Sequence, residues 1–133
     1  MTDLTMKVTT PKGYDETLAL VRERLGDAGF GVLTEIDVKA TLKTKLDVDV
    51  EPQVILGACR PQLAHAAMQA DPSIAALLPC NVVVRTEGDH TVVEAFDPQA
   101  MITMAADTPD ALRDVAIDAR ARLADALESV RNA

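Results

Sequence analysis

The sequence predicts an α+β fold, a two-layer sandwich in which a mostly antiparallel sheet carries its helices on one face. Three observations predict it: a β-hairpin pattern across residues 82–96, a long amphipathic helix after Thr108, and an aliphatic composition. Hydrophobic residues make up 48% of the chain and aromatic residues 2%. We expect residues 1–133 to fold as a single α+β domain with a core of small aliphatic side chains.

The charge balance argues against several classes of partner. The chain has 21 acidic and 13 basic residues and a net charge of −8, which repels phosphate backbones and anionic lipids. With so few aromatic rings it offers no platform for stacking bases, so we expect no nucleic acid partner. No apolar run is long enough to span a bilayer, so we expect no membrane partner. The two cysteines suit a reducing compartment, and we expect a cytoplasmic protein.

The first third of the chain predicts a strand, a helix and a second strand. Residues 4–8 alternate apolar and polar side chains, as a short strand does. A helix follows from Tyr14, and Gly29 is placed to cap its end. Residues 31–37 then read as a strand. The buried face of the helix is expected to carry Leu18, Val21 and Leu25.

Residues 38–50 combine helical and alternating spacing, and we favour a short helix behind Asp37 followed by an extended piece. This segment holds the one basic cluster of the sequence. The cluster is either a docking face for an acidic partner or an ordinary solvated helix face. Its members are Lys39, Lys43 and Lys45.

The middle of the chain predicts a buried strand, followed by a broken helical segment that connects it to the next strand. The apolar run at residues 54–58 is typical of a central strand buried on both faces. Pro61 suits the first position of a helix that runs to Ala70. A second short piece is expected over residues 73–78, where Pro79 stops it.

The last third predicts a hairpin and a long helix. Residues 82–85 and 91–96 flank a tight Gly-containing turn, and Asp97-Pro98 ends the second strand. Thr108 is the expected N-cap of the final helix, with Pro109 at its first position. We expect this helix to lie on the sheet through Leu112, Val115, Ala119, Leu123, Ala126 and Val130.

Sequence motifs do not identify a reaction. The chain lacks a Gly-rich phosphate loop, an HExxH motif, a CxxC motif and a nucleophile-elbow serine. Whether the protein is an enzyme therefore stays open at this point.

Cys59 is the first residue with possible chemistry. It lies where a strand ends and a helix begins, beside Arg60, and both a helix N-terminus and a cation favour the thiolate. Such a cysteine serves as a nucleophile, a redox centre or a metal ligand. The alternative is a small buried hydrophobe.

Cys80 is expected at the same end of the sheet as Cys59 if the strands holding Ile55 and Val83 are antiparallel. His65 then supplies a nitrogen for a Cys₂His site that suits zinc or another soft metal. Met101 and Met104 have the spacing of a shared helical face, which fits Cu(I) ligands or, more commonly, core packing. The expected ligand-binding residues are Gly57, Cys59, Arg60, Cys80 and Asn81.

Five segments carry a resemblance to a known family. They are Gly29-Phe30-Gly31-Val32, Ile36-Asp37-Val38-Lys39, Ile55-Leu56-Gly57-Ala58-Cys59 with Pro61, Leu78-Pro79-Cys80-Asn81-Val82-Val83-Val84, and Asp97-Pro98. With these segments the chain resembles the domain-of-unknown-function family numbered 302 over nearly its whole length. The resemblance implies a two-layer α/β sandwich that associates as a homodimer and has no assigned activity. Both cysteines match the family pattern, whereas Arg60 stands where the family often has Asn.

Three functions remain in view. The leading one is a small binding module, a homodimer formed through a sheet edge or the long helix, that holds a small ligand or soft metal near Cys59 and Cys80. The second is a thiol-dependent enzyme or redox sensor that uses Cys59. The third is a structural protein that docks a partner through the lysines of residues 39–45.

Overall fold

The computed structural model describes residues 4–104 and 108–133. Within these residues five strands form one antiparallel sheet in the order β1-β5-β4-β3-β2. The strands are β1 (Thr5–Thr10), β2 (Gly31–Asp37), β3 (Gln53–Cys59), β4 (Cys80–Glu87) and β5 (His90–Phe96). The helices are α1 (Tyr14–Asp27), α2 (Val38–Leu46), α3 (Pro61–Ala70), the 3₁₀ helix η2 (Pro72–Leu77), α4 (Pro98–Met104) and α5 (Asp110–Asn132).

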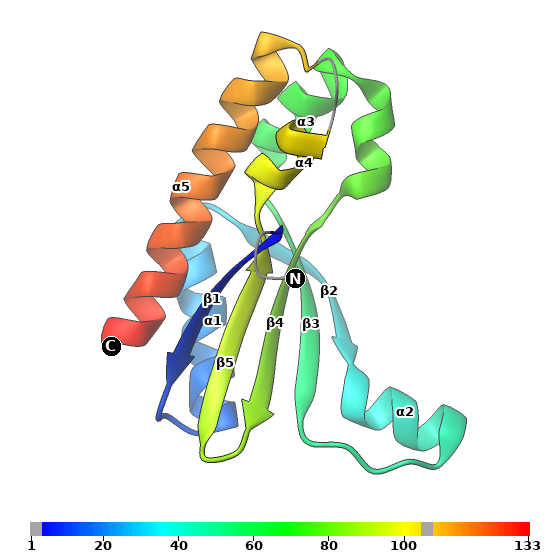
Figure 1. Cartoon of the computed structure of the whole chain (residues 1–133), viewed down its shortest axis with the longest axis vertical. Helices are drawn as coiled ribbons and strands as arrows, with labels where there is room; N and C mark the ends of the chain where they lie inside the picture. Colours follow the sequence, from blue (N-terminus) through cyan, green and yellow to red (C-terminus); the bar gives the residue numbers. More distant parts are fainter. Residues whose placement is uncertain (1–3, 105–107) are drawn as a thin grey trace.

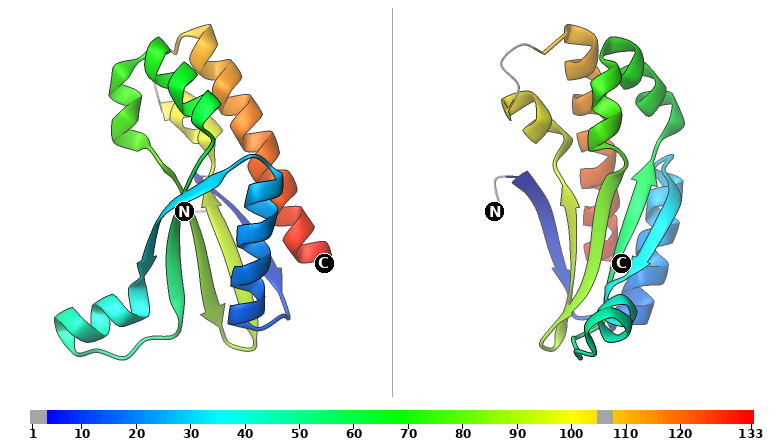
Figure 2. Two further views of the ribbon diagram at one scale, coloured as in Figure 1. Left: turned by 180° about the vertical axis from the view of Figure 1, so that it is seen from behind. Right: turned by 90° about the vertical axis from the view of Figure 1, so that its right-hand side faces the viewer.

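Helices α1 and α5 lie side by side on one face of the sheet, as Figures 1 and 2 show. Their buried side chains Val21, Leu25 and Leu123 join the inward-facing residues of the strands in one core cluster. This arrangement confirms the predicted α+β sandwich. That residues 1–133 form one folding unit stays a prediction.

The end of α1 shows how local sequence sets the entry to β2. Gly29 has φ of +91°, and its N–H donates to the carbonyl of Gly26 while that of Phe30 donates to the carbonyl of Leu25. The two bonds form a Schellman motif, in which a glycine takes the left-handed position. Phe30 and Leu25 then pack in the same core cluster, which fixes the direction of the chain into β2.

Helix α5 is longer than the sheet that it covers. Its 23 residues span about 34 Å, whereas a seven-residue strand such as β3 spans about 23 Å. The C-terminal half of α5 packs on the sheet through Leu123, Leu127 and Val130. Its N-terminal half extends past the sheet to α3, η2 and α4 (Figure 1), where Leu112 belongs to a second buried cluster. The expectation that the whole helix lies on the sheet is therefore wrong for this half.

The second sheet face carries none of the described helices, and the burial of β3 reflects this. Val54, Leu56 and Ala58 face α1 and α5 and are fully buried, whereas Ile55 on the other face is partly exposed. The prediction that this strand is buried on both faces is therefore wrong. On the same open face Glu94 accepts hydrogen bonds from Thr5 and Arg85, which hold the pKa of its carboxyl below the usual value.

Strand β2 is paired with β3 at the edge of the sheet, and helix α2 continues from it and projects from the lower end of the sheet (Figures 1 and 2). Residues 31–48 form the β2–α2 arm. The helix begins as predicted behind Asp37, whose carboxylate accepts a hydrogen bond from the N–H of Ala40. None of its side chains is buried. The lysines have local partners, since Lys43 pairs with Asp47 and Asp49, and the ammonium of Lys39 donates to the carbonyl of Val50.

The predicted helix α3, its 3₁₀ continuation and the β4–β5 hairpin are confirmed, but two details near α5 differ. Helix α4 was not predicted, because Asp97-Pro98 reads equally as a strand end and a helix start. The N-cap of α5 is Pro109 rather than Thr108, and Thr108 makes no capping hydrogen bond. Over the described ranges, no helix combines the length and the apolarity that crossing a membrane requires.

The Schellman motif gives the first testable prediction. A Cβ at position 29 strains the left-handed backbone and lies 3.0 Å from Nε of Arg60, so Gly29→Ala should lower the free energy of unfolding by about 1–2 kcal/mol. Gly26→Ala is the matched control, because a Cβ there meets nothing within 4 Å. It should leave stability unchanged or raise it by up to about 1 kcal/mol. Urea unfolding followed by circular dichroism measures both and checks for one cooperative transition; equal stabilities would contradict the assignment.

Candidate functional site

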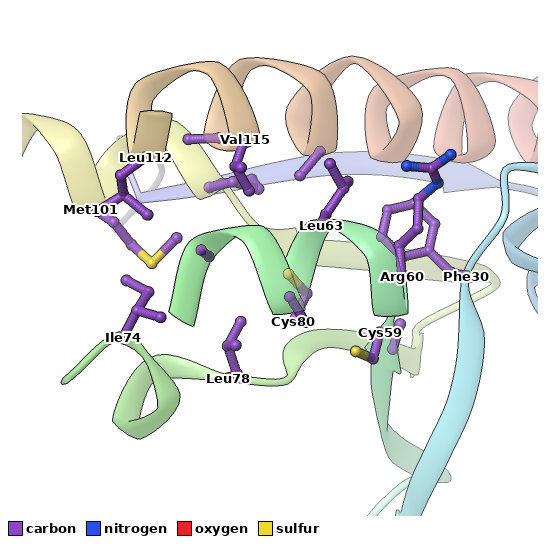
Figure 3. Close-up of a pocket in the computed structure, with 16 residues that line it drawn as sticks. Phe30, Cys59, Arg60, Leu63, Ile74, Leu78, Cys80, Met101, Leu112 and Val115 are labelled. Atoms are coloured by element: carbon purple, nitrogen blue, oxygen red, sulfur yellow. The ribbon is translucent and has the colours of Figure 1, made fainter. Parts of the chain in front are cut away.

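An apolar pocket lies where β3 ends and β4 begins, enclosed by α3, η2, α4 and α5. It runs along α5 from Met101 and Leu112 at one end to Arg60 and Phe30 at the other, as Figure 3 shows. It separates the core cluster under the sheet from the second cluster around Leu112 and Ile74. The pocket is therefore the gap between two packed regions that share α5.

Small side chains create this space. Four of the lining residues are alanines, two on α3 and two on α5, so each helix fills the gap only in part: Ala64, Ala67, Ala116 and Ala119. The cavity has a volume of about 40 Å³, about three times what a single water molecule requires. A site of this size accepts a short apolar group of about three heavy atoms.

Cys80 lines the pocket from the sheet. Its partner across the ladder is Ala58, so its side chain shares the helix-covered face and packs against the core cluster. Burial in this lining raises the pKa of the Cys80 thiol to about 11, and the nearby Cys59 adds to the rise. At neutral pH this sulfur is a protonated, apolar wall of the pocket.

Cys59 lies at the same end of the sheet, but its side chain leaves on the opposite face. Side chains alternate along a strand, so Cys59 follows Gly57 toward the open face while Ala58 faces the helices. Figure 3 shows its sulfur directed away from α5, whereas that of Cys80 points toward it. The two cysteines are both free. The predicted antiparallel strands are confirmed, and they place the two cysteines near each other. Both residues line the pocket, although their side chains leave the strands on different faces of the sheet.

Arg60 closes one end of the pocket. It is the N-cap residue of α3, and its side chain reaches toward α5, beside Phe30 (Figure 3). Its guanidinium lies 3.7 Å from a carboxylate oxygen of Asp118 on α5. The side chain also passes over Gly29, where a Cβ would be only 3.0 Å from Nε. Arg60 thus lies between the turn that joins α1 to β2 and helix α5.

Two of the predicted ligand-binding residues do not line this pocket. Gly57 is buried beneath Thr34 and Pro79, and a Cβ at its position would lie 2.1 Å from Oγ1 of Thr34. This glycine therefore permits close packing on the open face. Asn81 is exposed on the same face, where it borders shallow depressions beside Phe96.

The predicted metal site is not assembled. His65 is exposed and does not line the pocket, although α3 begins beside Cys59. Within residues 4–104 and 108–133, no three His, Cys, Asp or Glu side chains gather closely enough to hold a metal ion. Cys59 and Cys80 lie near each other, whereas His65 is exposed on α3 and does not join them in such a group. Met101 lines the pocket, and the side chain of Met104 lies outside the described residues.

Sequence reasoning missed the helical side of the pocket. Leu63 carried no signal of its own, Leu112 was expected to pack on the sheet, and Met101 was considered only as a Cu(I) ligand or a core residue. One signal was present in the sequence: alanines recur at helical spacing on α3 and α5, where larger residues would fill the gap.

The raised pKa of Cys80 makes stability depend on pH. The folded state favours the protonated thiol. Its contribution to the free energy of unfolding is therefore fully present below pH 9 and is lost as pH rises toward 11. Between pH 8 and pH 10.5 the free energy of unfolding should fall on the order of 2 kcal/mol more in the wild type than in Cys80→Ala. Cys59→Ala is the control and should keep most of the wild-type dependence, because burial is the larger cause of the raised pKa and Cys59 the smaller one. Urea titrations at both pH values measure it, and equal slopes in all three proteins would refute the burial of this thiol.

Comparisons with known proteins identify the family but assign no reaction. Curated proteins give no match. The crystal structure of an uncharacterized conserved DUF302 protein from Bacillus stearothermophilus is similar to this chain, with a TM-score of 0.87 and 32% identity, over 96% of this chain and 98% of that one. The family model described as "Domain of unknown function DUF302" matches residues 6–130. This chain therefore belongs to the DUF302 family, whose activity is unknown.

Proposed function

We propose that this protein is a small binding module that takes a short apolar molecule, or the apolar part of one, into the pocket between α3, α5 and the sheet end. The observation that carries the proposal is the cavity itself. Its lining is apolar apart from Arg60 and the thiols, and it lies at the junction of two well-packed clusters. Concave apolar sites with a few placed polar groups are the usual form of small-molecule sites.

The proposal favours binding over thiol chemistry. Cys80 lines the pocket from the sheet, and its raised pKa keeps it protonated and weakly nucleophilic at neutral pH. Cys59 also borders the pocket, but its sulfur is directed away from α5 (Figure 3). A protonated thiol and two unpaired cysteines also fit a reducing location, and we propose the cytoplasm.

Filling the cavity tests the proposal. Ala67→Leu adds three carbon atoms in the pocket, about the volume available, so the variant should fold with unchanged or higher stability and should lose binding. The probe is 1-propanol, titrated while amide chemical shifts are recorded by NMR. In the wild type we expect saturable shifts around the pocket at millimolar concentration, and Ala67→Leu should abolish them.

Ala121→Leu is the matched control, because Ala121 is exposed on α5 and does not line the pocket. It should bind 1-propanol as the wild type does. Saturable shifts that persist in Ala67→Leu, or their absence in the wild type, would overturn the proposal.

We further propose a homodimer formed through the β2–α2 arm. Four large apolar side chains are exposed over 16 consecutive positions of this arm, with Leu33 and Leu46 each 66% exposed, Ile36 49% and Val48 41%. Strand β2 is also an edge of the sheet, with unpaired backbone groups along one side. A second copy that covers both features would need to bury on the order of 1,200 Å² of total surface to form a stable interface.

Light scattering coupled to size exclusion tests the dimer. The wild type should show twice the monomer mass at micromolar concentration, and Leu33→Asp combined with Leu46→Asp should give the monomer mass with an unchanged circular dichroism spectrum. Ile117→Asp is the control, because Ile117 is 53% exposed on α5 and should not affect assembly. A wild-type monomer, or dissociation caused equally by Ile117→Asp, would contradict this interface.

A further inference from the structure

We infer that the ligand of the pocket is a short-chain anion, whose apolar tail enters the cavity and whose charged group binds the guanidinium of Arg60. The inference rests on the proposed function and names the class of ligand that the same site takes. It depends on where Arg60 lies, on how weakly it is paired, and on the size of the cavity.

Arg60 is the charged residue of the pocket lining. The other lining side chains are aliphatic, aromatic, thiol or thioether groups, so a ligand with one charged group has one complementary position for it. The side chain of Arg60 is only 21% exposed, which keeps competing water scarce while part of the side chain still reaches solvent. Charge-assisted hydrogen bonds are strengthened in such partly buried settings.

The guanidinium of Arg60 has unused hydrogen-bonding capacity. Its contact with Asp118 is 3.7 Å, longer than a hydrogen bond, and within the described residues its side chain donates no hydrogen bond to protein. A guanidinium has five N–H donors arranged to bind a carboxylate or phosphate through two of them. Other arginines donate hydrogen bonds to a carboxylate, which Arg60 does not do within the described part of the chain: Arg85 donates to Glu94 at 2.8 Å and Arg120 donates to Asp97 at 3.1 Å.

Asp118 does not need Arg60 as its partner. Nε of Arg122, one turn further along α5, donates to Asp118 at 3.2 Å. If Arg60 turns to a ligand, Asp118 keeps this hydrogen bond and no carboxylate is left unpaired. The three side chains together carry a charge of +1, so the site still attracts an anion although the whole protein carries −8.

The cavity limits the tail. About 40 Å³ holds about three heavy atoms, which excludes long acyl chains and nucleotides from complete burial. A short carboxylate meets both requirements, with two to four carbons in the cavity and the carboxylate at Arg60. A small phosphate ester or sulfonate with the same tail has the same chemistry.

The probes are butyrate and its neutral isostere butyramide, titrated by NMR at constant ionic strength. Butyrate should bind the wild type at least about tenfold more tightly than butyramide. Arg60→Gln should remove this preference while leaving the affinity for butyramide unchanged. Arg22→Gln is the control, because Arg22 is exposed and paired with Glu35 away from the pocket, and it should keep the preference.

Asp118→Asn provides a second test that does not depend on the folding of the Arg60 variant. It frees Arg60 from its competing carboxylate and should strengthen butyrate binding severalfold without affecting butyramide. Equal affinities for the two probes in the wild type, or no change in either variant, would overturn the anionic ligand while leaving the apolar pocket intact. Failure of both probes and of 1-propanol to bind would instead reject the proposed function and this inference with it.

Discussion

The long C-terminal helix is the constraint on which the rest of the molecule depends. Its apolar stripe continues for 23 residues, but the sheet is shorter than the helix. The half of α5 that passes the sheet end needs other partners to bury Leu112 and Ala116, and α3, η2 and α4 provide them. The chain therefore has a sandwich at one end of α5 and a helical cap at the other.

The pocket is a consequence of this shared helix. Two clusters pack against α5, one on the sheet and one in the cap, and alanines of α3 and α5 line the space between them. A protein interior of ordinary density would fill such a gap, because an empty volume forfeits dispersion contacts. A retained cavity beside a weakly paired arginine is the arrangement expected of a site that gives up packing energy for binding.

The cysteines show how strand geometry separates residues that lie close together. Cys59 and Cys80 end and begin adjacent antiparallel strands, but the alternation of side chains sends one to the open face and the other to the core. Cys80 consequently has a raised pKa and serves as an apolar wall. The same alternation explains Gly57, whose missing side chain makes room for Thr34 and Pro79 rather than for a ligand.

Local sequence patterns predict much of the secondary structure without any tertiary information. Each of four elements follows from a local pattern: the helical spacing from Tyr14, the proline at the start of α3, the glycine-containing hairpin turn and the apolar stripe of α5. The hairpin also determines one antiparallel strand pairing. The location of the site near Cys59, Arg60 and Cys80 follows from these elements as well.

The tertiary structure decided which of those residues share a space. The length of α5 relative to the sheet created the pocket and brought Met101 and Leu112 to it, and the rotation of α3 turned His65 into solvent. It also set Arg60 against Asp118, which lies 58 positions further along the chain. Such contacts depend on distances between separate elements, and the periodicity of any one segment carries no information about them.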